Sequence, residues 1–312
     1  MTTATHNFDE FLKDHSLYQS AYATLEEENR LLAVSAQLVY ELHRSELGQV
    51  AEEILAFIGH RFGTDFMKRY MARVNAMAEL QKRFDANPSA ATLGDPGARV
   101  DPDDYGLALL LSIVLTNHRF EMMRVLRRFL GELSSADGGS IVSIGSGAGY
   151  ELKLIAQALP NWEIESYDTD SHMQSMARQL LGFFKVAQGM RFASLFPLEQ
   201  PSREFVGKYD AVVLCEVLEH LTNAAGALYA LRECLKDTGR MFVTMAINIA
   251  QEDHVFLYPD VKSCRSQMRD CGFAVEYEWL APQSIRFLPD DREADFRKGN
   301  YIAVVSKSNN AA

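Results

Sequence analysis

Three glycines at alternate positions, Gly145, Gly147 and Gly149, constrain this chain more than any other stretch of it. The residues before them, 141–144, are mostly β-branched and predict a buried strand, whereas residues 150–159 place apolar side chains on one stripe of a helix. A strand, a glycine turn and a helix form the first half of a nucleotide-binding βαβ unit. The glycines let the backbone approach a ligand closely, and the helix N-terminus leaves free N–H groups that point at it.

Downstream of the glycines, strand-like stretches alternate with amphipathic helical ones. We expect strands at 162–167, 190–193, 209–215, 240–244, 273–280 and 301–305, and helices at 171–186, 223–236 and 260–271. This alternation predicts a parallel sheet with helices on both faces. Prolines and charge clusters leave no room for a helix between the last two strands, so we expect these to pair antiparallel. The expected fold is α/β, a Rossmann-like sheet of about seven strands, mostly parallel, with a C-terminal antiparallel strand.

The chain divides by pattern into residues 1–133, an expected all-helical domain, and residues 134–312, the α/β domain. Thr24 and Glu27 fit a capping box at the start of a helix. Amphipathic stripes predict helices within 31–42, 47–62 and 65–84. These stripes are more often core than a ligand site, and no chemistry is assigned to them.

Asp101 and Pro102 mark the strongest helix start before the glycines, with an acid at the N-cap and proline at the first helical position. The helix is almost entirely apolar in its first half, so we expect it to be buried and to run to about residue 133 with a break near Thr116. Residues 87–97 form a loop by composition. The helical domain suits a lid over a substrate cavity, a surface that pairs two copies of the chain, or a dock for a partner.

The charge balance limits the partners of the protein. The 312 residues carry a net charge of −11, which repels phosphate backbones and disfavours a nucleic-acid substrate. The four cysteines show neither a C-x-x-C pair nor a zinc spacing, so they read as reduced thiols. No secretory leader is visible, and no apolar run reaches the ~20 residues that span a bilayer. We expect a cytoplasmic protein without a membrane segment.

The glycine spacing separates two classes of nucleotide site. A dinucleotide fingerprint would place its third glycine at position 150, which is Tyr150. The pattern G-x-G-x-G instead resembles motif I of class I S-adenosylmethionine (SAM)-dependent methyltransferases. That family usually carries an acid two positions before the first glycine, where this sequence has Ser143.

Two further motifs extend the resemblance over residues 137–306. Asp168 lies about twenty residues after the glycines, where the βαβ architecture places an acid on the ribose hydroxyls. It opens a stretch similar to the second motif of the family, in which Asp170 is expected only to cap a helix. The run from Tyr209 to Leu221 contains Glu-x-x-Glu-His-Leu and resembles the fourth-strand motif of ubiquinone- and menaquinone-biosynthesis-like methyltransferases.

The resemblance implies SAM as cofactor, with S-adenosylhomocysteine (SAH) as product, and in-line methyl transfer to an O, N or C nucleophile. Ser194 substitutes for the acid that many members place near the adenine. Expected cofactor contacts are Gly145, Ser146, Gly147, Gly149, Asp168, Thr169, Ser194, Cys215 and Glu216. His220 and His254 are the candidate catalytic residues that face the acceptor, although a structural histidine is an equally good interpretation of either.

Three functions remain open at this point. The first is methylation of a small molecule, and it is the function we predict. A helical domain beside the α/β domain suits an enzyme of a specialised-metabolite pathway, and a complex with SAH would test this function best. The second is metal-assisted RNA 2′-O-methylation, because Glu216, Glu219, His220 and His254 resemble the metal ligands of such enzymes. We predict that no metal is bound there, because the Glu-His-Leu run is widespread in metal-free relatives. The third is a SAM-binding regulatory or scaffold protein without turnover.

Overall fold

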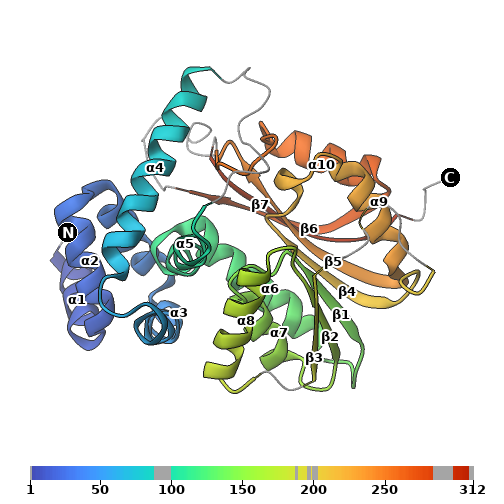
Figure 1. Cartoon of the computed structure of the whole chain (residues 1–312), viewed down its shortest axis with the longest axis horizontal. Helices are drawn as coiled ribbons and strands as arrows, with labels where there is room; N and C mark the ends of the chain where they lie inside the picture. The colour runs from blue at the N-terminus through green and yellow to red at the C-terminus, as the bar shows by residue number, and fades with distance from the viewer. Residues whose placement is uncertain are drawn as a thin grey trace.

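The computed structural model describes residues 2–87, 100–186, 189–194, 198, 203–283 and 298–308, with side chains described from residue 7 onward. The described part of residues 2–133 is helical, as predicted, and lies to one side of the sheet (Figure 1). The helices are α1 (Thr2–Asp14), α2 (Ser16–Glu28), α3 (Arg30–Phe62), α4 (Phe66–Ala86), α5 (Pro102–Leu115) and α6 (Asn117–Leu133).

The start of α3 differs from the sequence prediction. Thr24 lies inside α2, where its hydroxyl donates a hydrogen bond to the carbonyl of Ser20 at 3.2 Å, so the capping box predicted at Thr24 is wrong. A threonine within a helix readily bonds back to the preceding turn in this way. The cap is Asn29 instead, whose side-chain oxygen accepts a hydrogen bond from the backbone N–H of Leu32 at 3.3 Å.

The stretches predicted as helical at 31–42 and 47–62 both lie in α3, as two helical segments joined at a kink. This helix, α3, bends at His43, whose backbone leaves the helical region (φ −125°, ψ 18°). The His43 ring lies 3.2 Å from the side-chain oxygen of Asn117 and stacks on Phe120 with ring centroids 4.6 Å apart. Contacts with α6 therefore stabilise the bend. The sequence of α3 alone does not predict these contacts.

The start and the break predicted for the apolar helix are both confirmed. The side chain of Asp101 accepts a hydrogen bond from the N–H of Asp104 at 3.0 Å and caps α5. Thr116 is extended (φ −131°, ψ 138°) and separates α5 from α6. Its hydroxyl donates back to the carbonyl of Ser112 at 2.7 Å, so it closes α5 rather than capping α6. The loop predicted at 87–97 lies outside the described residues from 88 onward.

The sheet has the predicted Rossmann-like arrangement. Its order is β3-β2-β1-β4-β5-β7-β6, and β7 is antiparallel to both of its neighbours. The strands are β1 (Ser140–Ile144), β2 (Glu163–Tyr167), β3 (Met190–Ala193), β4 (Tyr209–Cys215), β5 (Leu235–Ile247), β6 (Phe273–Pro282) and β7 (Gly299–Lys307). The connecting helices are α7 (Tyr150–Ala158), α8 (Ser171–Phe183), η1 (Leu218–His220), α9 (Ala224–Cys234) and α10 (Val261–Asp270).

Strand β5 is longer than the predicted 240–244. It pairs with β4 on one side and β7 on the other, so neighbours on both edges extend it in each direction. The last two strands pair antiparallel, as predicted. The segment between them that was expected to contain no helix lies outside the described residues at 284–297.

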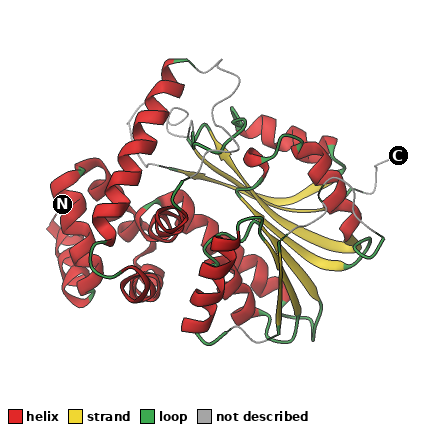
Figure 2. Cartoon of the chain, in the orientation of Figure 1, coloured by secondary structure: helices red, strands yellow, loops and turns green. Residues whose placement is uncertain are grey.

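Helices cover both faces of the sheet (Figure 2), and a hydrophobic core lies on each face. Neighbouring residues of a strand point to opposite faces, so Ile141 packs with α6, α7 and α8 whereas Val142 packs with α9 and α10. The core around Ile141 is continuous with the buried side chains of α1 to α5. The N-terminal helices therefore share a core with one face of the sheet.

Candidate active site

The glycine turn connects β1 to α7 through backbone conformations that favour glycine. Gly147 has φ +47°, and a Cβ there would lie 3.0 Å from the Leu109 side chain of α5. Gly149 has φ +87°, and its Cβ would lie 2.7 Å from the Cα of Ala177 in α8. Such values of φ strain residues with a side chain. Gly147 thus leaves space at the turn, whereas Gly149 allows α7 and α8 to pack closely.

A cavity of about 390 Å³, the loop cavity, opens above this turn at the carboxyl ends of β1, β2 and β4. Ligand crevices of doubly wound sheets lie at this edge. Most of the residues predicted to contact cofactor or acceptor line it: Gly145, Ser146, Gly147, Asp168, Thr169, Ser194, Cys215, Glu216 and His220. Gly149 and His254, from the same predicted set, are not among its lining residues.

Asp168 follows β2 and faces the glycine turn. Its carboxylate accepts hydrogen bonds from the N–H groups of Gly147 and Asp170, both at 2.9 Å. Burial raises the pKa of Asp168 above its ordinary value in spite of these bonds. Asp170 caps α8, as predicted, by accepting a hydrogen bond from the N–H of His172 at 2.7 Å.

The N-terminal helices supply much of the remaining wall, which the sequence did not indicate. Tyr105, Leu109, Leu110 and Ile113 of α5 line the loop cavity, as does Arg119 in the first turn of α6. The apolar residues on all sides of α5 predicted that this helix is buried. They did not predict which elements it packs against. No local pattern singled out Arg119.

Arg119 lies between two carboxylates that line the loop cavity. Its guanidinium pairs with Glu216, and a second nitrogen lies 3.9 Å from the carboxylate of Glu151 in α7. Burial raises the pKa of Glu151, which the positive charge of Arg119 opposes. Ser143, which replaces the usual acid of motif I, is 2% exposed within β1. Acidic groups therefore reach this cavity from α7 and from the end of β4.

A second cavity of about 340 Å³, the helical cavity, lies between the N-terminal helices and the sheet. Its walls come from the starts of α3 and α6, from α4 and α5, and from the segment after β5. Five residues line both cavities and define the neck between them: Tyr105, Leu109, Arg119, Glu216 and Gln251. The two spaces therefore adjoin at the Arg119–Glu216 pair, here called the neck pair.

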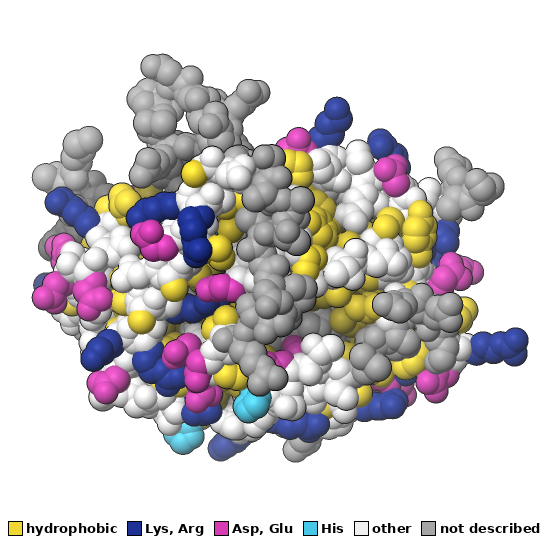
Figure 3. All heavy atoms as spheres, turned by 45° about the horizontal axis from the view of Figure 1, so that its top comes forward, with side chains coloured by type: hydrophobic (Ala, Val, Ile, Leu, Met, Phe, Trp, Pro, Cys, Tyr) yellow, Lys and Arg dark blue, Asp and Glu magenta, His cyan; other side chains and the backbone are white. Residues whose placement is uncertain are grey.

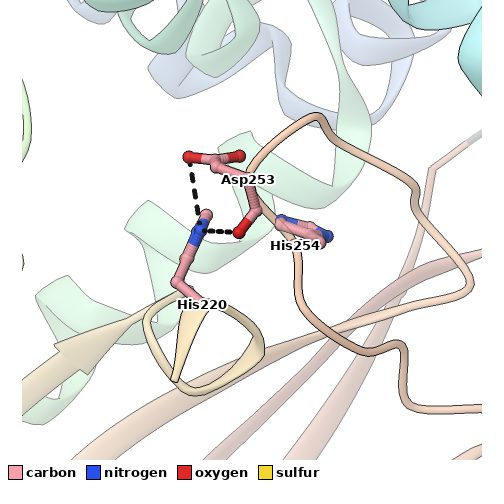
Figure 4. Close-up of side chains that lie close together, drawn as sticks. All are labelled: His220, Asp253 and His254. Carbon is pink, nitrogen blue, oxygen red and sulfur yellow. Dashed lines mark hydrogen bonds and ion pairs between the residues drawn. The ribbon is translucent and has the colours of Figure 1, made fainter. Parts of the chain in front are cut away.

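The side chains of His220, Asp253 and His254 form a cluster (Figure 4), and the first two line the loop cavity. His220 Nδ1 lies 3.3 Å from a carboxylate oxygen of Asp253 and 3.3 Å from its backbone carbonyl. Burial lowers the pKa of His220, but the hydrogen bond with Asp253 and the charges of Glu219 and Asp253 outweigh it and raise the pKa overall. This fixes Nδ1–H on Asp253 and leaves Nε2 for a ligand.

His254 lies behind His220 and is fully buried. Its Nδ1 lies 2.8 Å from the carbonyl of Ile249, and its ring meets the His220 ring edge-on with centroids 4.7 Å apart. Burial, followed by the charge of His220, lowers the pKa of His254 to about 3, so the ring is neutral. In this position His254 contacts His220 rather than either cavity.

The four residues that resemble RNA-methyltransferase metal ligands are Glu216, Glu219, His220 and His254, and in this structure they do not form one group. Glu216 is paired with Arg119, and a carboxylate oxygen of Glu219 accepts a hydrogen bond from the N–H of Ala246 at 3.1 Å. Within the described part of the chain, the group whose ligand atoms lie within 4.8 Å of one another is His220, Asp253 and His254. Neither glutamate belongs to that group.

Comparison with known proteins identifies the domain. A family model for the methyltransferase domain matches residues 115–284, more than half of the chain. Among solved structures, the CurJ carbon methyltransferase aligns with a TM-score of 0.51 and 15% identity over 86% of this chain and 70% of that one, which shows a shared fold. NodS, an N-methyltransferase from Bradyrhizobium japonicum WM9 in complex with SAH, aligns with a TM-score of 0.45 and 16% identity over 61% and 86%. A SAM-dependent methyltransferase from Aquifex aeolicus aligns with a TM-score of 0.48 and 11% identity over 66% of this chain and 98% of that one. No curated protein matches the sequence.

Proposed function

The chain belongs to the class I SAM-dependent methyltransferases, and on that premise we propose that it methylates a small molecule held in the helical cavity. The observation that supports this acceptor site is that the two cavities share the five wall residues of the neck, so an acceptor in one cavity would lie next to a methyl donor in the other. Both volumes fall within the range of small-ligand pockets, roughly 300–1,000 Å³.

The lining and the charges of the loop cavity support SAM as its ligand. A side chain at Gly147 would fill the space above the turn, and the Asp168 carboxylate faces that turn as a partner for ribose hydroxyls. We assign the amino-acid end of SAM to Arg119, Glu216 and Glu151, whose opposite charges complement a carboxylate and an ammonium group. Ser194 remains the candidate for the adenine, and Ser146, Thr169 and Cys215 complete the wall.

The bound cofactor supplies a methyl group on a sulfonium, already activated for displacement by the acceptor nucleophile. The protein aligns the two reactants and excludes water from the neck. Where the acceptor must lose a proton, His220 Nε2 is the candidate base, because Asp253 holds the opposite nitrogen. His254, predicted as catalytic, is here proposed to position the His220 ring from behind.

The surface gives less support to an RNA substrate. On the face drawn in Figure 3, acidic and basic side chains of the described residues are interspersed, and the whole chain is acidic. A nucleic-acid site usually shows a basic stripe.

None of the helices in the described part of the chain has the length and apolar character of a bilayer-spanning segment.

The test combines structure with an unbiased search for the acceptor. A crystal structure with SAH should place its sulfur at the neck and leave the helical cavity accessible. Incubation of the enzyme with a metabolite extract and methyl-tritiated SAM should then transfer label into small molecules. Transfer into the RNA fraction would support the RNA function instead, and SAH binding without transfer into any fraction would support a non-catalytic protein.

A further inference from the structure

The charged side chains that line the helical cavity are already paired with opposite charges. Arg73 is 8% exposed and holds both oxygens of the Glu252 carboxylate, at 2.5 and 2.7 Å. Lys298 Nζ lies 2.6 Å from the carboxylate of Asp85, and the neck pair accounts for the remaining charges. Among the described lining residues, every cation and every carboxylate therefore has a partner of opposite sign.

Polar side chains of the same wall are used within the protein as well. Gln81 accepts a hydrogen bond from the N–H of Ala250 at 2.9 Å and donates one to the carbonyl of Asn248 at 3.1 Å. The hydroxyl of Ser112 donates to the carbonyl of Leu109 at 2.8 Å. Much of the remaining lining is aliphatic, including Leu31, Leu32, Val74, Met77 and Ala108.

Among the described lining residues, three buried side-chain nitrogens lack a hydrogen-bond partner, Nε of Arg73, Nε of Arg119 and Nδ1 of His118, and the uncharged group among them is His118. It lies in the first turn of α6, is 6% exposed, and lines the helical cavity. Its buried Nδ1 has no hydrogen-bond partner within the described part of the chain. Burial, followed by the charge of Arg119, lowers the pKa of His118 to about 3, so the ring is neutral, with one nitrogen as donor and the other as acceptor.

We propose that the helical cavity takes an uncharged, largely apolar acceptor that forms a hydrogen bond with the His118 imidazole. A charged acceptor would lose its hydration without gaining an unpaired partner in this wall, because the neck pair is assigned to the amino-acid end of SAM. To gain a partner it would have to separate the Arg73–Glu252 pair, whose cation is buried. An apolar body gains free energy from the aliphatic wall, and a hydroxyl or amide on it satisfies the imidazole. This assignment rests on the proposed function, because it takes the helical cavity as the acceptor site.

Four naphthalene probes of nearly equal size test the charge rule on the full-length protein saturated with SAH. They are 2-naphthol, naphthalene, 2-naphthoate and 2-naphthylmethylammonium, with dissociation constants measured by fluorescence at neutral pH. We expect 2-naphthol to bind at least about tenfold more tightly than the anion or the cation. Equal or tighter binding of either ion, or no binding of 2-naphthol, would overturn the proposal.

The His118→Phe variant tests the hydrogen bond while it preserves a planar ring. The affinity for 2-naphthol should fall roughly two- to tenfold, and the affinity for naphthalene should stay the same. His118→Gln, which restores a donor and an acceptor, should recover part of the loss. Equal losses for both probes in His118→Phe would show a purely structural role and contradict the assignment.

Val74→Trp locates the probes, because its larger ring should fill the helical cavity and abolish 2-naphthol binding while SAH still binds. Undiminished 2-naphthol binding in this variant would place the probe elsewhere and overturn the proposal. SAH binding also reports correct folding in every variant. If the wild-type protein fails to bind SAH, the proposed function fails; if SAH binds but the probes break the charge rule, only the inference on the acceptor fails.

Discussion

The loop cavity and the helical cavity adjoin at the neck but are walled by different kinds of structure. Backbone turns at the ends of parallel strands shape the loop cavity, with glycines where the chain bends. Side chains of helices distant in sequence shape the helical cavity, as when Met77 of α4 and Ile249 after β5 share its wall. Short contiguous sequence motifs predict a site that is formed by backbone turns. A site that is formed by side chains of several packed helices can be recognised only in the tertiary structure.

The largest expected effect comes from removing the region that contains the helical cavity. A chain that starts at Ser134, the predicted domain boundary, loses α6 and its buried Phe120, Leu126 and Leu130, which pack on the same face as Ile141. The uncovered sheet should aggregate or melt without cooperativity. A chain that starts at Thr116 keeps α6 and should retain β-sheet circular dichroism. A soluble, SAH-binding 134–312 fragment would show that α6 belongs to the helical domain.

The next effect tests the turn that shapes the loop cavity. Gly147→Val forces a β-branched residue to φ +47° and brings side-chain atoms against Leu109, so SAH affinity should fall more than about a hundredfold by calorimetry. Gly182→Ala in α8 is the matched control, because its Cβ meets nothing within 4 Å. Unchanged SAH affinity in Gly147→Val would remove the cofactor from this turn.

Asp168→Ala should weaken SAH by about 1.5–3 kcal/mol, roughly ten- to a hundredfold, through loss of charge-assisted hydrogen bonds to the ribose. 5′-Methylthioadenosine has the same ribose without the amino-acid end, so its affinity should fall by a similar factor. Normal melting with full affinity for both ligands would leave Asp168 as a turn residue that holds Gly147 and Asp170.

Arg119→Met probes the residue that joins the two cavities. SAH affinity should fall about tenfold while 5′-methylthioadenosine binds as before, because only SAH has an amino-acid end. Since this substitution leaves the carboxylate of Glu216, which is only 12% exposed, without its cation, the double variant Arg119→Met/Glu216→Gln removes both charges as a control for stability. An equal loss of affinity for both ligands would show that Arg119 stabilises the fold and does not bind the amino-acid end of SAH.

The smallest effect concerns the protonation of His220. Asp253→Asn removes the carboxylate that raises the pKa of His220, while burial and the neighbouring His254 and Glu219 remain. The pKa of His220, followed by NMR of the imidazole carbon, should therefore move to lower pH. With an acceptor in hand, the acidic limb of the pH–rate profile should move in the same direction. An unchanged pKa of His220 would show that Asp253 does not interact with His220 in solution.

The sequence by itself determined the sheet and the turns at the strand ends that form one side of the loop cavity. Strand periodicity, the glycine spacing and the position of Asp168 are local patterns, and each reports a backbone that must turn or pair in one way. The break at Thr116 and the cap at Asp101 were predicted for the same reason. The limits of such patterns show at Thr24, where a plausible cap lies inside a helix.

Only the tertiary structure decided what lines the helical cavity and the neck. Folding brings Arg119 to Glu216, almost a hundred positions further along the chain, and the packing of α4 and α5 turns ordinary core-like stripes into a cavity wall. His118 gives no signal in sequence, because a lone histidine acquires meaning from burial and from its neighbours' charges. Long-range packing decides which buried side chains are satisfied internally and which are left to a ligand, and no local pattern encodes that choice.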